Sequence, residues 1–235
     1  MARFYYEDSA QPWRADSIVR RFLSKAISPQ RRREPQRRAL DLGLGYGRNA
    51  VWLAGQGYRA EGWERDRRYV AEARRRAREL KLKLVVRRED FTTAKLREPY
   101  DVIVISQALH QVKRSAALRV LRRIKGVLTQ GGRLFLLAKL TSDRHFQRVR
   151  RDPAWKAVKG ERNTWLRPVA RKRGSYHPGR PRRPQMILSA LELGEIRQAL
   201  KGLRVVHWRV VVLRSDWEEE VPVTHTVAEV VAEKD

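Results

Sequence analysis

Residues 39–48 read ALDLGLGYGR, an apolar run that leads into three glycines at alternate positions, Gly43, Gly45 and Gly47. Helical spacing of apolar residues then continues to residue 55, so the stretch predicts a strand, a glycine turn and a helix. Glycine has no Cβ, adopts positive φ easily and lets the backbone pass close to a bound nucleoside. Alone, the turn is a weak signal, because ordinary tight turns and dinucleotide-binding folds share it.

Strands and helices alternate along the rest of the chain. Apolar runs predict further strands at 59–63, 82–87, 100–106, 133–138, 204–214 and 224–232. Amphipathic spacing predicts helices at 16–26, 69–80, 115–128 and 189–200. Such alternation implies a largely parallel sheet with helices on both faces. A chain of 235 residues is long enough for a single α/β domain over 1–235 that also carries one insertion.

The chain is strongly basic and contains no cysteine. Its 53 Lys and Arg against 26 Asp and Glu give a formal charge of +27, which makes nucleic acid a candidate partner; solvated helix faces are the alternative explanation. The lack of cysteine excludes disulfides and cysteine nucleophiles, and five scattered histidines suggest no metal site. No apolar run approaches the roughly 20 residues of a membrane span, and the first residues lack signal-peptide character. We therefore expect a cytoplasmic protein without membrane contact.

Regular periodicity stops between residues 141 and 184. The segment is rich in Arg, Lys, Pro and Gly, and we interpret 141–185 as a basic insertion after the fifth strand, with one short helix near 154–159. Basic residues alternate there with aromatic ones, as in sites for single-stranded nucleic acid. An anionic small molecule or a solvated loop fits the same composition. Tyr176 and His177 are candidate substrate contacts in this segment.

Two acidic residues strengthen the interpretation of the glycine turn. Asp41 lies on the strand just before the glycines, and Glu64 ends the next strand, 23 residues later. Nucleotide-binding folds place a ribose-binding acid about 20 residues after such a turn. A carboxylate there accepts hydrogen bonds from the ribose hydroxyls, and its charge strengthens them. A surface ion pair with Arg65 or Arg68 is the alternative role of Glu64.

These motifs resemble those of one enzyme family. Residues 39–49, ALDLGLGYGRN, resemble motif I of class I S-adenosylmethionine (SAM)-dependent methyltransferases, and residues 57–64, GYRAEGWE, resemble their second motif. Within the two stretches, Gly47-Arg48-Asn49 and Gly57-Tyr58 are similar to the tellurite-resistance methyltransferases and their thiopurine-type relatives. The similarity covers about residues 36–140. The departures from the family's commoner residues are Leu44 for Cys or Ala, Glu64 for Asp, and Gln130 for Pro.

The resemblance implies a fold and a set of cofactor contacts. The fold is α/β and Rossmann-like, a seven-stranded, mostly parallel sheet in which the last strand is antiparallel. The implied cofactor-binding residues are Asp41, Gly43 and Gly45 around the methionine part of SAM, Gly47 in the same turn, Glu64 at the ribose, Asp90 and Phe91 at the adenine, and Ser106 and Gln107 beside the methionine moiety. The chemistry of Asp90 agrees, because a carboxylate accepts hydrogen bonds from an exocyclic amine; capping a helix N-terminus is its alternative role.

Methyl transfer from a sulfonium is a direct displacement, so the protein mainly aligns the reactants and excludes water. His110, just after the fourth strand, is the candidate general base, because an unperturbed histidine titrates near pH ~6.5; packing is its alternative role. Residues 1–30 are expected to form an N-terminal helical lid, with Trp13 and Arg14 as candidate substrate contacts. Packing of the first helix against the core is the alternative for that segment.

Three functions remain open. The first is SAM-dependent methyl transfer to a small-molecule acceptor. The second is methylation of RNA or a ribosomal protein through the basic insertion, although no Asn-Pro-Pro-Tyr-like motif follows the fourth strand, where residues 106–109 read SQAL. The third is a non-catalytic binding protein or a nicotinamide-dependent oxidoreductase on a similar fold. Arg48 stands where the dinucleotide pattern has its last glycine, which argues against a nicotinamide cofactor.

Overall fold

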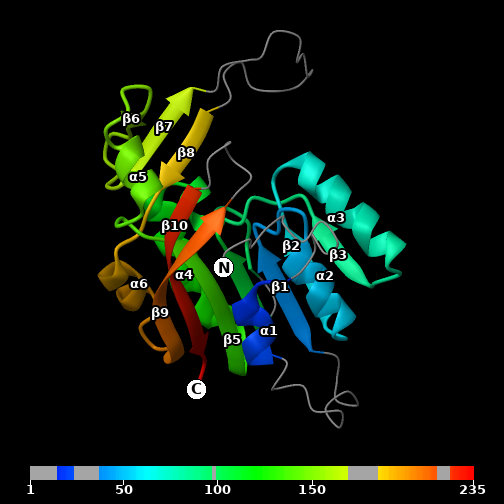
Figure 1. Ribbon diagram of the computed structural model, residues 1–235. Helices are drawn as coiled ribbons and strands as arrows, with labels where there is room; N and C mark the ends of the chain where they lie inside the picture. Colours follow the sequence, from blue (N-terminus) through cyan, green and yellow to red (C-terminus); the bar gives the residue numbers. More distant parts are fainter. Residues whose placement is uncertain (1–14, 24–36, 97–98, 169–184, 216–222) are drawn as a thin grey trace, which may run out of the picture.

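The computed structural model describes residues 15–23, 37–96, 99–168, 185–215 and 223–235 (Figure 1). A seven-stranded sheet forms the centre of the molecule, in the order β3-β2-β1-β4-β5-β10-β9. Its strands are β1 (Arg38–Leu42), β2 (Arg59–Trp63), β3 (Leu84–Arg87), β4 (Tyr100–Ser106), β5 (Leu128–Lys139), β9 (Arg204–Ser215) and β10 (Val223–Glu233). The helices around it are α1 (Ser17–Leu23), α2 (Arg48–Gly55), α3 (Arg67–Glu79), α4 (Arg114–Val127) and α6 (Leu193–Ala199).

The strand directions confirm the expected mixed sheet. Strands β3, β2, β1, β4 and β5 pair in parallel, and β10 is antiparallel to both of its neighbours, β5 and β9. The chain builds outward from β1 to β3 on one side and then crosses over to place β4 on the other side of β1. Ligands of open α/β sheets bind at such a switch point, outside the carboxyl ends of the strands.

Alternating side chains of the central strands fill two separate cores. On β1 and β4, Ala39, Val102 and Val104 pack with α1 and α2 on one face of the sheet. Leu40 and Ile103 point to the opposite face and pack with α4 and α6. Because both faces are covered by helices, the strands are apolar at almost every position, which explains why they were recognised as continuous apolar runs.

The insertion forms a small body with its own core. Helix α5 (Arg144–Val149) is followed by a three-stranded antiparallel sheet of β6 (Lys156–Ala157), β7 (Thr164–Pro168) and β8 (Gln185–Ser189). Its buried apolar side chains are Phe146, Val149, Trp155, Leu188 and Ala190, and Trp165 packs against them. The body lies beyond the carboxyl ends of the parallel strands (Figure 1).

The expected helix at 154–159 is wrong. Residues 156–157 form β6, which pairs with β7, and the helix of this segment is α5, ten residues earlier. Asp143 begins α5 by accepting a hydrogen bond from the backbone N–H of Phe146, and Phe146 and Val149 follow at helical spacing on its buried side. The helix expected from residue 189 also begins later, at Leu193, because Ser189 ends β8 and Glu192 forms a capping box with Glu195.

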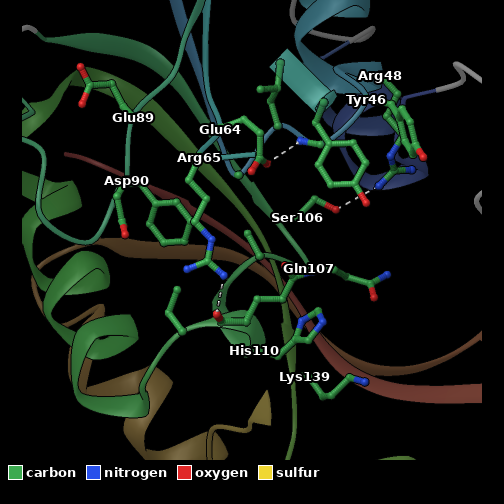
Figure 2. Close-up of a pocket in the computed structure, with 18 of the residues that line it drawn as sticks. Tyr46, Arg48, Glu64, Arg65, Glu89, Asp90, Ser106, Gln107, His110 and Lys139 are labelled. Atoms are coloured by element: carbon green, nitrogen blue, oxygen red, sulfur yellow. Dashed lines mark hydrogen bonds between the residues drawn. The ribbon is translucent and has the colours of Figure 1, made fainter. Parts of the chain in front are cut away.

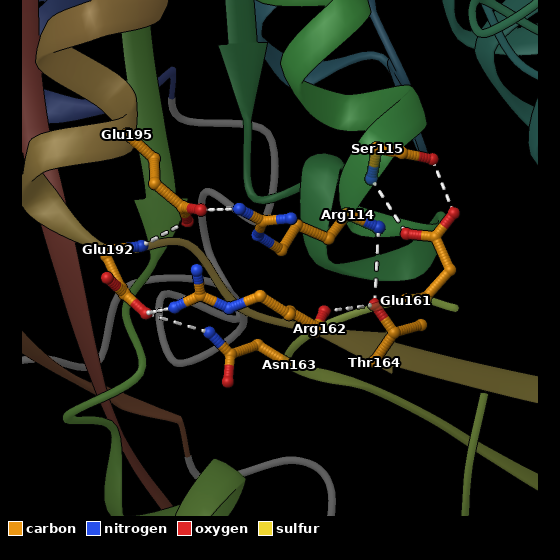
Figure 3. Close-up of polar contacts among 8 residues, drawn as sticks. All are labelled: Arg114, Ser115, Glu161, Arg162, Asn163, Thr164, Glu192 and Glu195. Atoms are coloured by element: carbon orange, nitrogen blue, oxygen red, sulfur yellow. Dashed lines mark hydrogen bonds and ion pairs between the residues drawn. The ribbon is translucent and has the colours of Figure 1, made fainter. Parts of the chain in front are cut away.

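Polar contacts join the insertion to the helices of the main sheet (Figure 3). The backbone N–H and hydroxyl of Ser115, at the start of α4, donate to the carboxylate of Glu161. Arg162 pairs with Glu192 at 2.9 Å, and Arg114 pairs with Glu195. The contacts of Glu161 and Arg162 connect the turn before β7 to the starts of α4 and α6, and the pair of Arg114 with Glu195 joins these two helices to each other.

Within the described ranges, every helix is too short or too polar to span a membrane.

Candidate functional site

A cavity opens at the carboxyl ends of β1, β2, β4 and β5, at the switch point of the sheet (Figure 2). Its lining includes seven of the nine residues expected to bind cofactor, namely Gly43, Gly45, Glu64, Asp90, Phe91, Ser106 and Gln107. His110, the candidate base, also lines it. The two expected residues outside the lining are Asp41 and Gly47.

The glycine turn is shaped by positive φ at all three glycines, 72° at Gly43, 54° at Gly45 and 85° at Gly47. A Cβ on Gly43 would stand 2.4 Å from the Cβ of Ala108, so a larger residue would displace the loop that follows β4. A Cβ on Gly45 would meet no atom within 4 Å, which leaves its backbone open toward the cavity. A Cβ on Gly47 would lie 3.0 Å from the Cβ of Ala73. The absence of that atom permits close packing of α2 on α3.

Glu64 is fixed at the end of β2 by two backbone contacts. Its Oε2 accepts from the N–H of Gly45 at 3.2 Å, and its Oε1 accepts from the N–H of Asp66 at 2.9 Å. The carboxylate is half-buried and faces the cavity. Each oxygen has a second lone pair, so the group can still accept hydrogen bonds from a diol. The alternative expected for Glu64, an ion pair with Arg65 or Arg68, is not what holds it.

Asp41 lies beneath the turn. Its side chain is buried, and Oδ2 accepts from the backbone N–H of Ala50 at 3.2 Å, in the first turn of α2. Burial raises the pKa of Asp41 to about 7, against the opposing effect of the nearby Arg48 guanidinium. Asp41 therefore supports the turn and the start of α2 from below and does not touch the cavity.

Asp90 and Phe91 follow β3 and form the far wall of the cavity. Oδ1 of Asp90 accepts hydrogen bonds from the backbone N–H and the hydroxyl of Thr92, at 2.9 and 2.6 Å. Asp90 thus caps a turn, where its alternative role supposed a helix, and it also lines the cavity. The ring of Phe91 is 8% exposed and lies under Gly43, 3.4 Å from the position of a Cβ there.

The loop after β4 carries Ser106 and Gln107. The hydroxyl of Ser106 accepts from Nη2 of Arg48 at 3.1 Å. Gln107 has φ of 50°, which costs energy for a residue with a Cβ, and its backbone N–H donates to the carbonyl of Leu137 on β5. Backbone strain of this kind is concentrated at functional sites.

Arg48 is a cavity residue that the sequence did not single out. It stands at the first position of α2, and its guanidinium forms an ion pair with Asp16 at 2.7 Å, with side chains 14% and 2% exposed. Asp16 also exchanges hydrogen bonds with Asn49, which joins the start of α1 to the start of α2. A fixed cation at a helix N-terminus is suited to an anionic group of a ligand.

The end of the cavity away from Glu64 holds His110 and Lys139 (Figure 2). His225 also lines the cavity, and neither Lys139 nor His225 was expected. His110 lies on the short 3₁₀ helix η2 (Leu109–Gln111). Burial, and then the charge of Lys139, hold the pKa of His110 well below its usual range. Its Nδ1 is buried and has no hydrogen-bond partner within the described part of the chain. Lys139 directly follows the strand predicted at 133–138 and is the last residue of β5, so a search for side chains at the carboxyl ends of strands could have found it.

Four expected substrate contacts, Trp13, Arg14, Tyr176 and His177, lie outside the described residues. Of the expected lid at 1–30, the structure describes 15–23. Helix α1 packs there with Ile18, Val19 and Leu23 against the sheet, as the core-packing alternative stated, and lines no part of the cavity.

Comparison with known proteins finds similarity to methyltransferases in sequence and in fold. A family model described as a methyltransferase domain matches residues 39–132. The probable S-adenosyl-L-methionine-dependent methyltransferase TehB of Haemophilus influenzae is 26% identical over 120 residues, which are 51% of this chain and 40% of that protein. The match thus spans less than half of the relative's length.

Solved structures share the fold. The crystal structure of TehB from Haemophilus influenzae has a TM-score of 0.62 and 16% identity, covering 94% of this chain and 66% of that one. Magnesium protoporphyrin IX methyltransferase (ChlM) from Synechocystis PCC 6803, solved with bound SAH, has a TM-score of 0.62 and 16% identity, covering 94% of this chain and 81% of that one. At this identity the likeness concerns the fold. Together with the domain match across the glycine turn, these relationships make the chain similar to SAM-dependent methyltransferases, over residues 39–132 in sequence and over most of its length in fold.

Proposed function

We propose that this protein transfers the methyl group of SAM to a small-molecule acceptor by direct displacement. One observation carries the proposal: a single cavity runs from the glycine turn and Glu64 to His110 and Lys139. A cofactor held at the first end would direct its methyl group toward an acceptor at the second. The likeness to TehB and to magnesium protoporphyrin IX methyltransferase supports a small acceptor.

The residues at the first end suit the parts of SAM in turn. Glu64 offers a fixed, charged acceptor to the ribose hydroxyls, beside the open backbone of Gly45. Phe91 offers an aromatic surface for the adenine, and the carboxylate of Asp90 offers an acceptor for the exocyclic amine. These assignments agree with the resemblance in the sequence.

The methionine part of SAM requires partners of both charges. Arg48 lines the cavity at the start of α2 and contacts Ser106, which makes it the proposed partner of the carboxylate. The backbone of Gly43 and of Gln107 approaches the same region from β1 and β4. SAM itself supplies a methyl group bonded to a positively charged sulfur.

The acceptor end provides alignment and weak proton-accepting capacity. His110 is neutral because burial and Lys139 lower its pKa, so its ring nitrogens can exchange hydrogen bonds with an acceptor. The same low pKa makes His110 a poor proton acceptor. This weakens the expected role of His110 as a strong general base and favours a role in positioning.

The described part of the insertion gives little support to nucleic acid as acceptor. Trp155 is 8% exposed, and Trp165 packs edge-on against Phe146, 5.1 Å between ring centroids. Aromatic side chains that stack nucleic acid bases need exposed ring faces. In this body they form the core instead.

The test is a transfer assay with SAM labelled in its methyl group. Purified protein is incubated with the small-molecule fraction, the RNA and the protein fraction of one cell extract in separate reactions. We expect the label to appear in the small-molecule fraction only. Label in RNA or protein alone would contradict a small-molecule acceptor while leaving the methyltransferase activity established.

A further inference from the structure

Two tyrosines form an aromatic pair at the cavity. Tyr46 stands in the glycine turn, between Gly45 and Gly47, and Tyr69 stands in the first turn of α3. The two rings meet edge to face, with 4.7 Å between their centroids and an interplanar angle of 75°, and both residues line the cavity. Tyr46 is 38% exposed, so part of its surface is accessible to a ligand.

Tyr69 is the anchored member of the pair. Cζ of Arg68 lies 5.9 Å from the centroid of the Tyr69 ring, and the guanidinium of Arg68 is in turn paired with the carboxylate of Asp66 at 2.8 Å. The Tyr69 ring therefore already faces a cation that belongs to the protein. Its contact with Tyr46 holds the second ring beside the glycine turn, at the cavity.

The covalent structure of SAM places its sulfur between two of the contacts proposed above. The sulfur is bonded to C5′ of the ribose and to the chain that ends in the methionine carboxylate. With Glu64 at the ribose and Arg48 at the carboxylate, the sulfur lies between these two residues. Tyr46 lies between the same two contacts, because its neighbour Gly45 donates to Glu64 and Arg48 follows two positions later. Figure 2 shows Glu64, Tyr46 and Arg48 around one end of the cavity.

The positive charge of a sulfonium group has to be stabilised where water is excluded. Of the carboxylates among the described lining residues, Glu64 accepts from two backbone N–H groups and is the proposed partner of the ribose. Glu89 and Asp90 lie on the side of the cavity opposite to Tyr46 and Arg48 (Figure 2). The face of an aromatic ring carries the negative part of its quadrupole and attracts a cation within about 6 Å of the ring centroid. The aromatic pair is therefore suited to the charge on sulfur.

We propose that Tyr46 recognises the positive charge of SAM through contact between its ring face and the sulfonium group. Tyr46 thereby distinguishes SAM from SAH (S-adenosylhomocysteine), whose sulfur is uncharged. This inference rests on the proposed function, and it concerns a residue to which the family resemblance gives no role. Methyl transfer leaves the electron pair of the broken carbon–sulfur bond on sulfur, which removes the charge and weakens the contact with Tyr46. The spent cofactor is then exchanged more easily for SAM.

The experiment compares the binding of SAM and of SAH by calorimetric titration, without a methyl acceptor. The ratio of the two dissociation constants measures recognition of the charge, because the two ligands share the adenosine and the amino-acid part. We expect Tyr46→Leu to lower the preference for SAM relative to SAH by about 3- to 30-fold, the range of a cation–π contact. Tyr46→Phe keeps the ring, so its preference should stay within about twofold of wild type.

A second series changes the electron distribution of the ring and keeps its shape. Tyr46→Phe is prepared with increasing numbers of fluorine atoms on the ring, each of which weakens the negative potential of the ring face. SAM affinity should fall stepwise along the series, while SAH affinity stays within about twofold. A role in packing alone would not separate the two ligands in this way. The series gives an answer even where Tyr46→Leu does not fold.

Phe22→Leu is the matched control, because it removes an aromatic ring from α1, which lines no part of the cavity. Both affinities of this variant should stay within about twofold of wild type. An unchanged ratio in a folded Tyr46→Leu, or equal losses of SAM and SAH affinity along the fluorinated series, would overturn the role of Tyr46 and leave the proposed function standing. Absence of binding of both ligands to the wild-type protein would overturn the proposed function together with this inference.

Discussion

At the scale of single residues, Glu64 combines two tasks. Its carboxylate holds the glycine turn through Gly45 and the start of α3 through Asp66, and it also faces the cavity. Two N–H donors fix the geometry of the group before any ligand arrives. Such preorganisation reduces the ordering cost of binding.

Replacing Glu64 by glutamine tests this role. The amide keeps one oxygen acceptor but loses the charge and turns the other acceptor into a donor, which the backbone N–H groups cannot use. We expect Glu64→Gln to weaken SAH binding by about 10- to 100-fold, corresponding to the roughly 1.5–3 kcal/mol of hydrogen bonds to a charged group. Calorimetric titration measures it, with Glu79→Gln at the exposed end of α3 as the matched control. Unchanged affinity in a folded Glu64→Gln protein would remove Glu64 from the cofactor site.

Asp41 gives stability an unusual pH dependence. Its folded pKa of about 7 lies above its ordinary value of 3.8, so the folded state holds the proton more tightly between these values. The contribution of Asp41 to the free energy of unfolding therefore falls by up to about 4 kcal/mol as pH rises through that window. Above the window the contribution is constant. Asp41→Asn retains an oxygen for the N–H of Ala50 and removes the charge.

The measurement for Asp41 is urea unfolding of both proteins at about pH 5 and about pH 8. We expect Asp41→Asn to gain stability relative to wild type on going from the lower to the higher pH. An equal difference in the free energy of unfolding at the two pH values would mean that Asp41 does not titrate in this window.

At the scale of elements, sequence patterns located the main sheet because its strands are buried on both faces. Residues 100–106 and 59–63 were predicted with the bounds that β4 and β2 have in the structure. The insertion was predicted poorly because its first strand has two residues and its helix has six, both too short to show a period. Asp143 followed by Phe146 and Val149 was the available signal for α5, but it lies among arginines that conceal the apolar spacing.

The contact between β8 and η2 could not be predicted, because it joins residues almost 80 positions apart. The hydroxyl of Ser189, which is 1% exposed, lies 2.7 Å from the carbonyl oxygen of Val112 and 3.3 Å from that of Leu109. Since η2 carries His110, the insertion helps to hold the acceptor end of the cavity in place.

Removing this hydroxyl should loosen η2. In Ser189→Ala the buried carbonyl of Val112 loses the hydroxyl that donates a hydrogen bond to it. We expect this loss to lower the free energy of unfolding by about 1–3 kcal/mol. We expect faster hydrogen–deuterium exchange at residues 109–112 and unchanged exchange in β1 and α2, with SAH affinity preserved. Ser189→Cys, whose thiol is a weaker donor, should give an intermediate rate. Exchange at 109–112 equal to that of wild type would show that β8 does not support η2.

At the scale of the whole molecule, βα alternation established the fold class, whereas the strand order came from the family resemblance. The periodicity of the sequence does not indicate which strands are neighbours in the sheet. The cavity depends on that order, because it forms where the crossover places β4 beside β1. The same limit applies to the site. Glu64, which directly follows a predicted strand, and Asp90, which the resemblance indicated, both line the cavity. His225 lies near the start of the last strand and reaches the cavity only because β10 runs antiparallel to β5.

The net charge of +27 makes the buried carboxylates important to stability, and Glu229 is one that contacts three other elements or side chains at once. From β10 it accepts hydrogen bonds from Arg21 of α1 at 2.8 Å and from Arg209 of β9 at 2.7 Å, and it lies 2.8 Å from Nε2 of His207. It thereby joins the first described helix to the last two strands. Burial alone would raise the pKa of Glu229, but the hydrogen bonds from Arg209, His207 and Arg21 outweigh it and hold the pKa below its ordinary value of 4.5.

Because the folded pKa of Glu229 is lowered, its contribution to stability is present above about pH 4.5 and is lost as pH falls through the folded value. Glu229→Gln leaves two arginines facing a neutral amide, and we expect a loss of about 1–3 kcal/mol at neutral pH, which lowers the melting temperature by several degrees. Glu72→Gln, which breaks a surface pair with Arg75, should cost less than about 0.5 kcal/mol. Thermal unfolding at neutral pH and near pH ~3 measures both variants. The gap between Glu229→Gln and wild type should shrink at the acidic pH, because protonation removes the same charge from the native residue; a gap that stays constant would mean that the charge of Glu229 does not hold α1 to the sheet.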